Sequence, residues 1–179
     1  MNYLIYIIIG LGALILSSKD ISDILLGDDK RDSFDYLFEL NAARFGVPAY
    51  VLKTIASIES DIGQDSRVLR GDTSGDSKSW GIMQIAPGLG SNKEIQLKSI
   101  NRKNATPGQL NNPEISIMIG ARLLGYLWKK YNGNEDLVSL AYNQGEKNTD
   151  NGRDFTPRFN SEGKSYKEKF KEHKKRILT

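Results

Sequence analysis

The stretch from residue 112 to 131 constrains the fold more than any other part of this sequence. It opens with Asn112, Pro113 and Glu114, which give a helix a capping side chain, a first-turn proline and a first-turn acid. The segment that follows, ISIMIGARLLGYLWKKY, carries apolar residues on nearly every side of the expected helix. A helix that is apolar all round must be surrounded by other elements. We therefore expect a central helix wrapped by further helices.

Further helices are predicted on both sides of this segment. Three stretches combine a helix-start residue with apolar residues at helical spacing: 33–46, 48–59 and 134–145. The last segment, 165–178, is amphipathic and strongly cationic. Residues 61–112 lack strong periodicity and hold most of the loop residues, with length for a short hairpin. Alternating β-branched residues are scarce. The sequence therefore predicts a mainly α domain with a small loop or hairpin lobe.

An uncharged apolar stretch precedes the first lysine, Lys19. Its 18 residues would form a helix about 27 Å long, close to the ~30 Å hydrocarbon core of a bilayer. We expect an N-terminal hydrophobic helix over 1–18 that anchors the chain in a membrane. A cleaved secretory signal and a helix buried in protein are the alternatives. The polar segment 19–32 is expected to link it to a globular domain over 33–179.

The composition excludes several kinds of site. The chain of 179 residues contains no cysteine, which excludes disulfides, a thiol nucleophile and a cysteine-ligated zinc site. His173 is the single histidine, so a histidine-cluster metal site is excluded and a Ser-His-Asp triad is disfavoured.

The formal net charge of +3 is concentrated at the C-terminus. Residues 164–179 carry seven lysines and arginines against two glutamates, whereas residues 33–163 carry equal numbers of acids and bases. Because the body of the domain is neutral, nucleic acid is not an expected partner. The basic tail suits anionic lipid headgroups or an acidic polymer, and a solvated helix face explains it equally well.

Glu59 is the candidate catalytic residue. It follows Leu52 by seven positions and Ile55 by four, so it lies on the apolar face at the C-terminal end of its expected helix. Loss of hydration and the negative end of the helix dipole both favour the protonated carboxyl group. A glutamic acid that keeps its proton near neutral pH can act as a general acid. The alternative is an ordinary glutamate that reaches solvent through its flexible stem.

Three short blocks then occur in order: ASIES at 56–60, GIMQI at 81–85 and AYNQG at 141–145. Together they resemble the lysozyme-like domain of soluble lytic transglycosylases and goose-type lysozymes. The resemblance covers roughly residues 45–175 and implies an α+β lysozyme-like fold. It implies that Glu59, which precedes a serine in the first block, is the catalytic acid. It also implies that the reaction needs no metal and no organic cofactor.

The resemblance further implies a cleft that binds sugars, with these contributing residues: Ser60, Met83, Gln84, Tyr142, Asn143 and Tyr166. The amides of Gln84 and Asn143 can read hydroxyl and N-acetyl groups. Tyr142 offers a flat face for a pyranose ring and a hydroxyl able to hold Glu59 in place. Met83 can instead pack beneath the cleft, and Ser60 can instead cap local backbone. Asp72, in a Gly-Asp pair that resembles one in goose-type enzymes, is a candidate second carboxylate.

By the same resemblance, the expected reaction is non-hydrolytic cleavage of the bond between N-acetylmuramic acid and N-acetylglucosamine in peptidoglycan, with a 1,6-anhydromuramoyl product. Hydrolysis of the same bond is the first alternative, and an inactive glycan-binding protein of the cell envelope is the second. Expected partners are glycan strands, a membrane through residues 1–18, and assembly partners in an envelope, a secretion machine or a virion. The domain is expected in the periplasm or elsewhere outside the cytoplasmic membrane, or in a phage particle.

Overall fold

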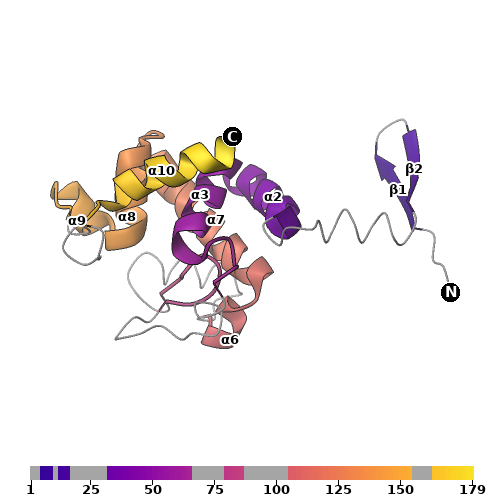
Figure 1. Cartoon of the computed structure of the whole chain (residues 1–179), viewed down its shortest axis with the longest axis horizontal. Coiled ribbons are helices and arrows are strands. Elements are labelled where there is room, and N and C mark those ends of the chain that lie inside the picture. Colours follow the sequence, from indigo (N-terminus) through magenta and orange to yellow (C-terminus); the bar gives the residue numbers. More distant parts are fainter. Residues whose placement is uncertain (1–4, 10–11, 17–31, 66–78, 87–104, 155–162) are drawn as a thin grey trace. The chain divides into compact units, whose positions relative to one another are not determined.

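The computed structural model describes residues 5–9, 12–16, 32–65, 79–86, 105–154 and 163–179 (Figure 1). The chain divides into two compact units, Met1–Tyr36 and Leu37–Thr179. The elements are, in chain order, β1 (Ile5–Ile9), β2 (Gly12–Leu16), the short 3-10 helix η1 (Asp32–Phe34), α2 (Asp35–Phe45), α3 (Ala49–Ser60), α6 (Pro107–Leu110), α7 (Pro113–Lys130), α8 (Glu135–Gln144), α9 (Glu146–Asp150) and α10 (Tyr166–Leu178).

The first unit contains an antiparallel strand pair where we expected a hydrophobic helix. Strands β1 and β2 pair in a register that runs from Ile5 opposite Leu16 to Ile9 opposite Gly12. The expected helix over 1–18 was therefore wrong for the described residues. β-Branched isoleucines fit a pleated strand, and the glycines of this stretch weaken a helix. Within the described ranges, no helix is both long and apolar enough to cross a membrane.

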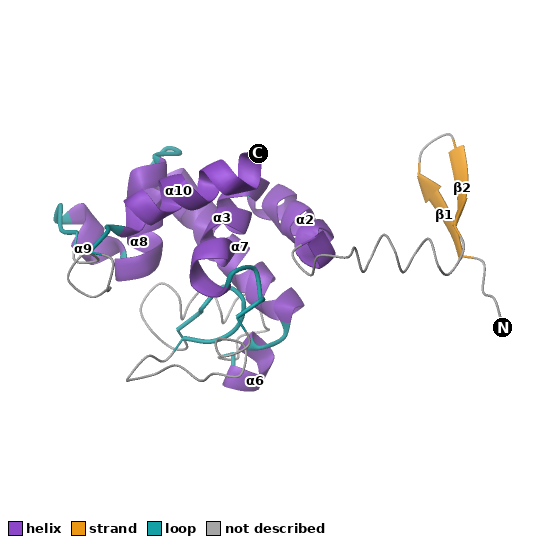
Figure 2. Cartoon of the chain, in the orientation of Figure 1, coloured by secondary structure: helices purple, strands orange, loops and turns teal. Residues whose placement is uncertain are grey.

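The second unit is mainly helical in its described part, which confirms the prediction of a mainly α domain (Figure 2). Most of the predicted loop or hairpin lobe over 61–112 lies outside the described residues. Its centre is α7, which contacts α3, α6 and α8. Asn112 caps this helix by accepting a hydrogen bond from the backbone N–H of Glu114 at 2.9 Å. The inner residues of α7 are buried, among them Ile117, Leu124 and Leu127. The central helix predicted from the apolar stretch is thus present and packed by its neighbours.

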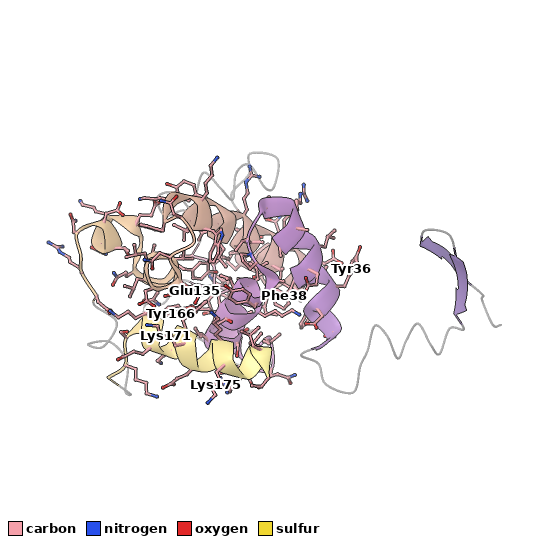
Figure 3. All side chains as sticks on the ribbon, turned by 90° about the horizontal axis from the view of Figure 1, so that it is seen from above. Tyr36, Phe38, Glu135, Tyr166, Lys171 and Lys175 are labelled. Carbon is pink, nitrogen blue, oxygen red and sulfur yellow. The ribbon has the colours of Figure 1, made fainter. Side chains whose placement is uncertain are left out.

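The last helix, α10, packs against α3 and α8. Ser165 starts it with a capping box, in which the hydroxyl of Ser165 accepts from the N–H of Glu168 and the carboxylate of Glu168 accepts from the N–H of Ser165. Two lysines of the basic tail form ion pairs with the first turn of α8. Lys171 lies 3.0 Å from Asp136 and Lys174 lies 2.7 Å from Glu135. Figure 3 labels Lys171 on α10 and Glu135 at the start of α8.

Candidate active site

Helix α3 brings Glu59 to a sharp bend in the backbone. Ile55, one turn earlier, is fully buried. After Ser60 the chain turns through two non-glycine residues with positive φ, 49° at Asp61 and 53° at Ile62. Such residues are uncommon and cost free energy unless the surrounding structure holds them. The N–H groups of Asp61 and Ile62 donate to carbonyls of the last helical turn at 3.2 and 3.1 Å, which fixes the bend beside Glu59.

The Glu59 carboxyl group is surrounded by protein on most sides and keeps partial contact with solvent. The hydroxyl of Tyr166, the first residue of α10, donates to its Oε1 atom at 2.5 Å. Burial raises the pKa of Glu59 from 4.5 to about 7, against the opposing effects of the Tyr166 hydrogen bond and the Lys169 charge. At neutral pH the group therefore has access to both its acidic and its basic form, as an acid–base catalyst requires.

Ser60 joins the end of α3 to the segment that contains the second sequence block. Its hydroxyl donates to the carbonyl of Ile82 at 2.8 Å and accepts from the N–H of Gly63 at 2.9 Å. The side chain is only 2% exposed. The structure therefore gives Ser60 the backbone-capping role that was the alternative, and its bond to Ile82 also steadies the neighbouring segment. It presents almost no surface to a ligand.

Residues 80–85 form a tight turn closed by two reciprocal backbone hydrogen bonds of 3.0 Å between Trp80 and Ile85. Gly81 has a φ of 74°, and a Cβ atom there would lie 1.8 Å from the carbonyl oxygen of Leu110. Gln84 also has a positive φ, and its amide donates to the Gly81 carbonyl at 3.0 Å. The glycine of this block is thus required for a close approach of two backbones.

The side chain of Met83, a residue of this turn, is buried and has no exposed surface. It packs against Gly120 of α7, where an added Cβ would come within 2.8 Å of the methionine side chain. Its backbone N–H donates to the hydroxyl of Ser116 at 3.2 Å. Met83 therefore packs between the turn and α7, and its side chain has no surface with which to contact a sugar.

Tyr142 of α8 has a different partner from the one we expected. Its hydroxyl donates to the carbonyl of Met83 at 2.6 Å, whereas Tyr166 holds Glu59. The pKa of Tyr142 is raised well above 10 by burial and by the charge of Glu59, so the two side chains lie in one electrostatic environment. The prediction that Tyr142 holds Glu59 was therefore wrong. Tyr142 instead ties α8 to the 80–85 turn.

Tyr142 also lines a groove of about 810 Å³. Its lining includes neutral amides, apolar side chains and the ring of Tyr142, and among these are Gln84, Ile85, Leu127, Asn143 and Gln144. The charged side chains that line it are balanced, two lysines against two acids. Tyr142 connects the groove with the surroundings of Glu59. A groove of this lining suits a neutral polymer rich in hydroxyl groups.

Two residues beyond those predicted bear on the site. Lys169 lowers the pKa of Glu59 through its charge, and the ring of His173 lies 2.9 Å from the hydroxyl of Ser57. Both follow Tyr166 at helical spacing, so the position of Tyr166 on an amphipathic helix was a usable signal. The candidate second carboxylate, Asp72, lies outside the described residues. Within those residues, no cluster of acids or histidines is arranged to hold a metal ion.

Comparison with known proteins identifies the family. The model of the transglycosylase SLT domain matches residues 36–162. The chain belongs to this family. The matched range includes Glu59, the 80–85 turn and Tyr142, and it ends before α10. Tyr166, whose hydroxyl donates to Glu59, therefore lies outside the matched range, and the structure alone shows its position beside Glu59.

Relatives of this SLT-domain chain are larger proteins. Over 65 residues it is 38% identical to the soluble lytic murein transglycosylase of Escherichia coli K12, in an alignment that covers 36% of this chain and 10% of that protein. The counterpart from Escherichia coli O157:H7 gives the same values. The chain thus spans about a tenth of the curated relatives it matches.

Two solved structures share the fold. One is an inactive mutant of the lytic transglycosylase Slt from Pseudomonas aeruginosa, with 22% identity and a TM-score of 0.53 over 89% of this chain and 25% of that one. The other is the 70 kDa soluble lytic transglycosylase of Escherichia coli, with 23% identity and a TM-score of 0.54 over 88% of this chain and 25% of that one. The second unit therefore has the SLT lysozyme-like fold.

Proposed function

We propose that this SLT-domain protein is a lytic transglycosylase that cleaves the bond between N-acetylmuramic acid and N-acetylglucosamine without consuming water. One observation carries the proposal. Glu59 has a pKa of about 7, accepts a hydrogen bond from the buried Tyr166, and acts through its charge on Tyr142, which lines the groove of about 810 Å³. Burial, Tyr166 and Lys169 account for this pKa, so the site needs no second carboxylate to prepare the acid.

The reaction uses the single carboxyl group twice. Protonated Glu59 gives its proton to the glycosidic oxygen, the bond from that oxygen to C1 of the muramoyl residue breaks, and N-acetylglucosamine leaves with a free 4-hydroxyl. The muramoyl N-acetyl group stabilises the positive charge at C1. The Glu59 carboxylate then takes the proton of the C6 hydroxyl while O6 bonds to C1. The product is a 1,6-anhydro sugar, and Glu59 is protonated again.

Tyr166 and Lys169 balance the two halves of this cycle. Burial favours the protonated acid, whereas the phenol donor and the ammonium charge favour the carboxylate. With these effects opposed, the pKa lies near neutral pH and neither proton transfer is strongly uphill. The groove beyond Tyr142 would hold the neighbouring sugars through amides and apolar surface, with Gln84 and Asn143 as hydrogen-bonding groups.

The products released from purified peptidoglycan strands test the proposal. Mass spectrometry is expected to show anhydromuramoyl ends and no incorporation of ¹⁸O from labelled water. Products heavier by one water would show hydrolysis instead and overturn the lyase assignment. Glu59→Gln is expected to lower the rate by about 10²- to 10⁴-fold, whereas Glu39→Gln, an exposed residue of α2, leaves it unchanged. Equal activity of Glu59→Gln and the wild type would remove Glu59 from the mechanism.

We also propose that the domain acts outside the cytoplasmic membrane, where peptidoglycan lies, with the apolar segment before Lys19 as its membrane attachment. The family supports the location, and the uncharged residues 1–18 support the attachment. Alkaline extraction of membranes from cells that express the full chain tests this. The protein is expected in the membrane pellet, and quantitative release into the supernatant would refute the attachment.

A further inference from the structure

Side chains from three helices meet in the C-terminal half of α10. The carboxylate of Glu135, the first residue of α8, accepts a hydrogen bond from the hydroxyl of Tyr50 at 2.7 Å. The Nζ atom of Lys174 donates to both oxygens of the same carboxylate, at 2.7 and 2.9 Å. Tyr50 is the second residue of α3. The cluster of Tyr50, Glu135 and Lys174, which we call the three-helix junction, therefore joins the beginnings of α3 and α8 to α10.

The three-helix junction is better defined than an ordinary surface ion pair. The Nζ atom of Lys174 lies 4.9 Å from the centre of the Tyr50 ring, close enough for a cation–π contact. The side chains of Lys174 and Glu135 are only 29% and 26% exposed, against 60% and 42% for the neighbouring pair of Lys171 and Asp136. Burial and the hydrogen bond with Glu135 raise the pKa of Tyr50 to about 12, so its hydroxyl stays a donor near neutral pH.

The junction and the contact with Glu59 lie on one side of the same helix. Tyr166, Phe170 and Lys174 follow one another at intervals of four residues, which aligns their side chains along α10. Tyr166 and Phe170 are buried. Eight residues of helix extend about 12 Å. A movement of α10 at Lys174 is therefore transmitted to the Tyr166 hydroxyl, because both side chains belong to one continuous helix.

Other groups act on Glu59 directly. They are the hydroxyl of Tyr166 and the charge of Lys169, both on α10, and the charge of Glu59 acts in turn on Tyr142 of α8. The junction holds a paired carboxylate and ammonium, whose fields nearly cancel at about 12 Å, and salt screens what is left. A hydrogen bond, in contrast, weakens steeply when its length or angle changes. Any effect of the junction on Glu59 must therefore pass through the position of α10.

We propose that Glu135 and Lys174 are positioning residues for the reaction, because the three-helix junction fixes α10 where the Tyr166 hydroxyl meets the Glu59 carboxyl group. The inference rests on the proposed function only where it treats Glu59 as the acid–base catalyst. When the junction is broken, Phe170 keeps α10 docked, but the phenol donates to the carboxylate with poorer geometry. Burial of Glu59 is then opposed less, and the carboxyl group keeps its proton to higher pH.

An NMR titration of the full chain labelled with ¹³C-glutamate measures the pKa of Glu59 without using activity. The Glu59 carboxyl signal is the one that Glu59→Gln lacks. Lys174→Met and Glu135→Met both break the junction, but they change the net charge in opposite directions. Both are expected to raise the pKa of Glu59, by roughly 0.3 to 1 unit. A direct effect of the lost charges would instead shift the pKa up in the first variant and down in the second.

Three further variants separate positioning from other effects. Lys171→Met is the matched control, because it removes the same charge from α10 together with a more exposed ion pair to α8, and it should shift the pKa by less than about 0.2 unit. Lys174→Arg, which can donate to both carboxylate oxygens, should keep the wild-type value. Lys174→Met in a Tyr166→Phe background should cause no further shift, because the hydrogen bond on which the junction acts is already absent.

The inference is wrong if the two junction variants shift the pKa in opposite directions or not at all, if Lys171→Met shifts it equally, or if the shift persists without the Tyr166 hydroxyl. Tyr50→Phe removes one hydrogen bond of the junction and no charge, so it should give a smaller shift of the same sign even if a methionine variant does not fold. Cleavage of peptidoglycan by the wild type is measured separately. An inactive wild type would end the proposed function, whereas the titration would still decide the role of the junction.

Discussion

Replacement of Glu59 by glutamine should make the protein more stable, and the gain should depend on pH. Burial raises the pKa of Glu59 from 4.5 to about 7 in the folded state. Between these two values the folded chain holds a proton that the unfolded chain has lost. Stability therefore falls as pH rises through this window, because ionisation is disfavoured only in the folded state. Glutamine has the size of the protonated acid and does not ionise.

The magnitude follows from the size of the shift. One pKa unit corresponds to about 1.4 kcal/mol, so a change from 4.5 to about 7 corresponds to about 3 kcal/mol once the pH exceeds both values. The hydrogen bond that the carboxylate accepts from Tyr166 is already included in this pKa. We expect Glu59→Gln to be about 3 kcal/mol more stable than the wild type at pH 8 and about equal to it at pH 4.

Urea unfolding at a series of pH values between 4 and 9 measures this difference directly. The free-energy gap between variant and wild type should open from pH 4.5 and level off above pH 7. Glu39→Gln, an exposed residue paired with Lys53 at 3.3 Å, should change stability by less than about 0.5 kcal/mol at every pH. A gap that is absent, or that has the same size at pH 4 and pH 8, would refute the assignment of Glu59 as a carboxyl group kept protonated by burial.

Three further variants test other contacts. Tyr166→Phe removes the donor that lowers the pKa of Glu59, so the pH profile of kcat/KM should move to higher pH by up to about one unit, and an unmoved profile would contradict this role. Ser60→Ala loses the bond to the Ile82 carbonyl and should lower the free energy of unfolding by about 1–2 kcal/mol in urea titrations. Gly81→Ala places a Cβ 1.8 Å from a carbonyl oxygen and should lower the melting temperature more than any of these, so a wild-type value would argue against the close approach.

The helices of the second unit could be predicted because residues close in sequence determine where each helix begins. Asn112 and Asn134 were expected at helix starts, and each caps the helix that follows with its side chain. Glu59 could also be chosen from its place on an apolar helix face. These features depend on residues within a few positions of each other, which is the range that a sequence pattern reports.

The partners of the two tyrosines could not be predicted in the same way. The hydroxyls of Tyr142 and Tyr166 both approach the surroundings of Glu59, and the final packing of α8 and α10 decides which of them reaches the carboxyl group. The helix prediction for residues 1–18 was wrong for another reason. An apolar run rich in isoleucine fits a strand as well as a helix, and periodicity does not separate them.

The net charge of the basic tail, considered alone, leaves out the ion pairs that its lysines form. Ion pairs join four of its lysines to acids, namely Lys164 to Glu172, Lys167 to Asp154, Lys171 to Asp136 and Lys174 to Glu135. Three of these acids lie outside the tail. The net charge of a segment therefore overstates the charge it presents to other molecules. The pairs to α8 instead help to fix the helix that carries Tyr166.

The bond between Tyr166 and Glu59 spans 107 residues of the chain. Contacts between such distant positions form late, after the intervening elements have assembled. A chain from which α10 has been removed would keep Glu59 but lose the phenol that lowers its pKa. The pKa of Glu59 is thus set in part by whether α10 is docked on α3.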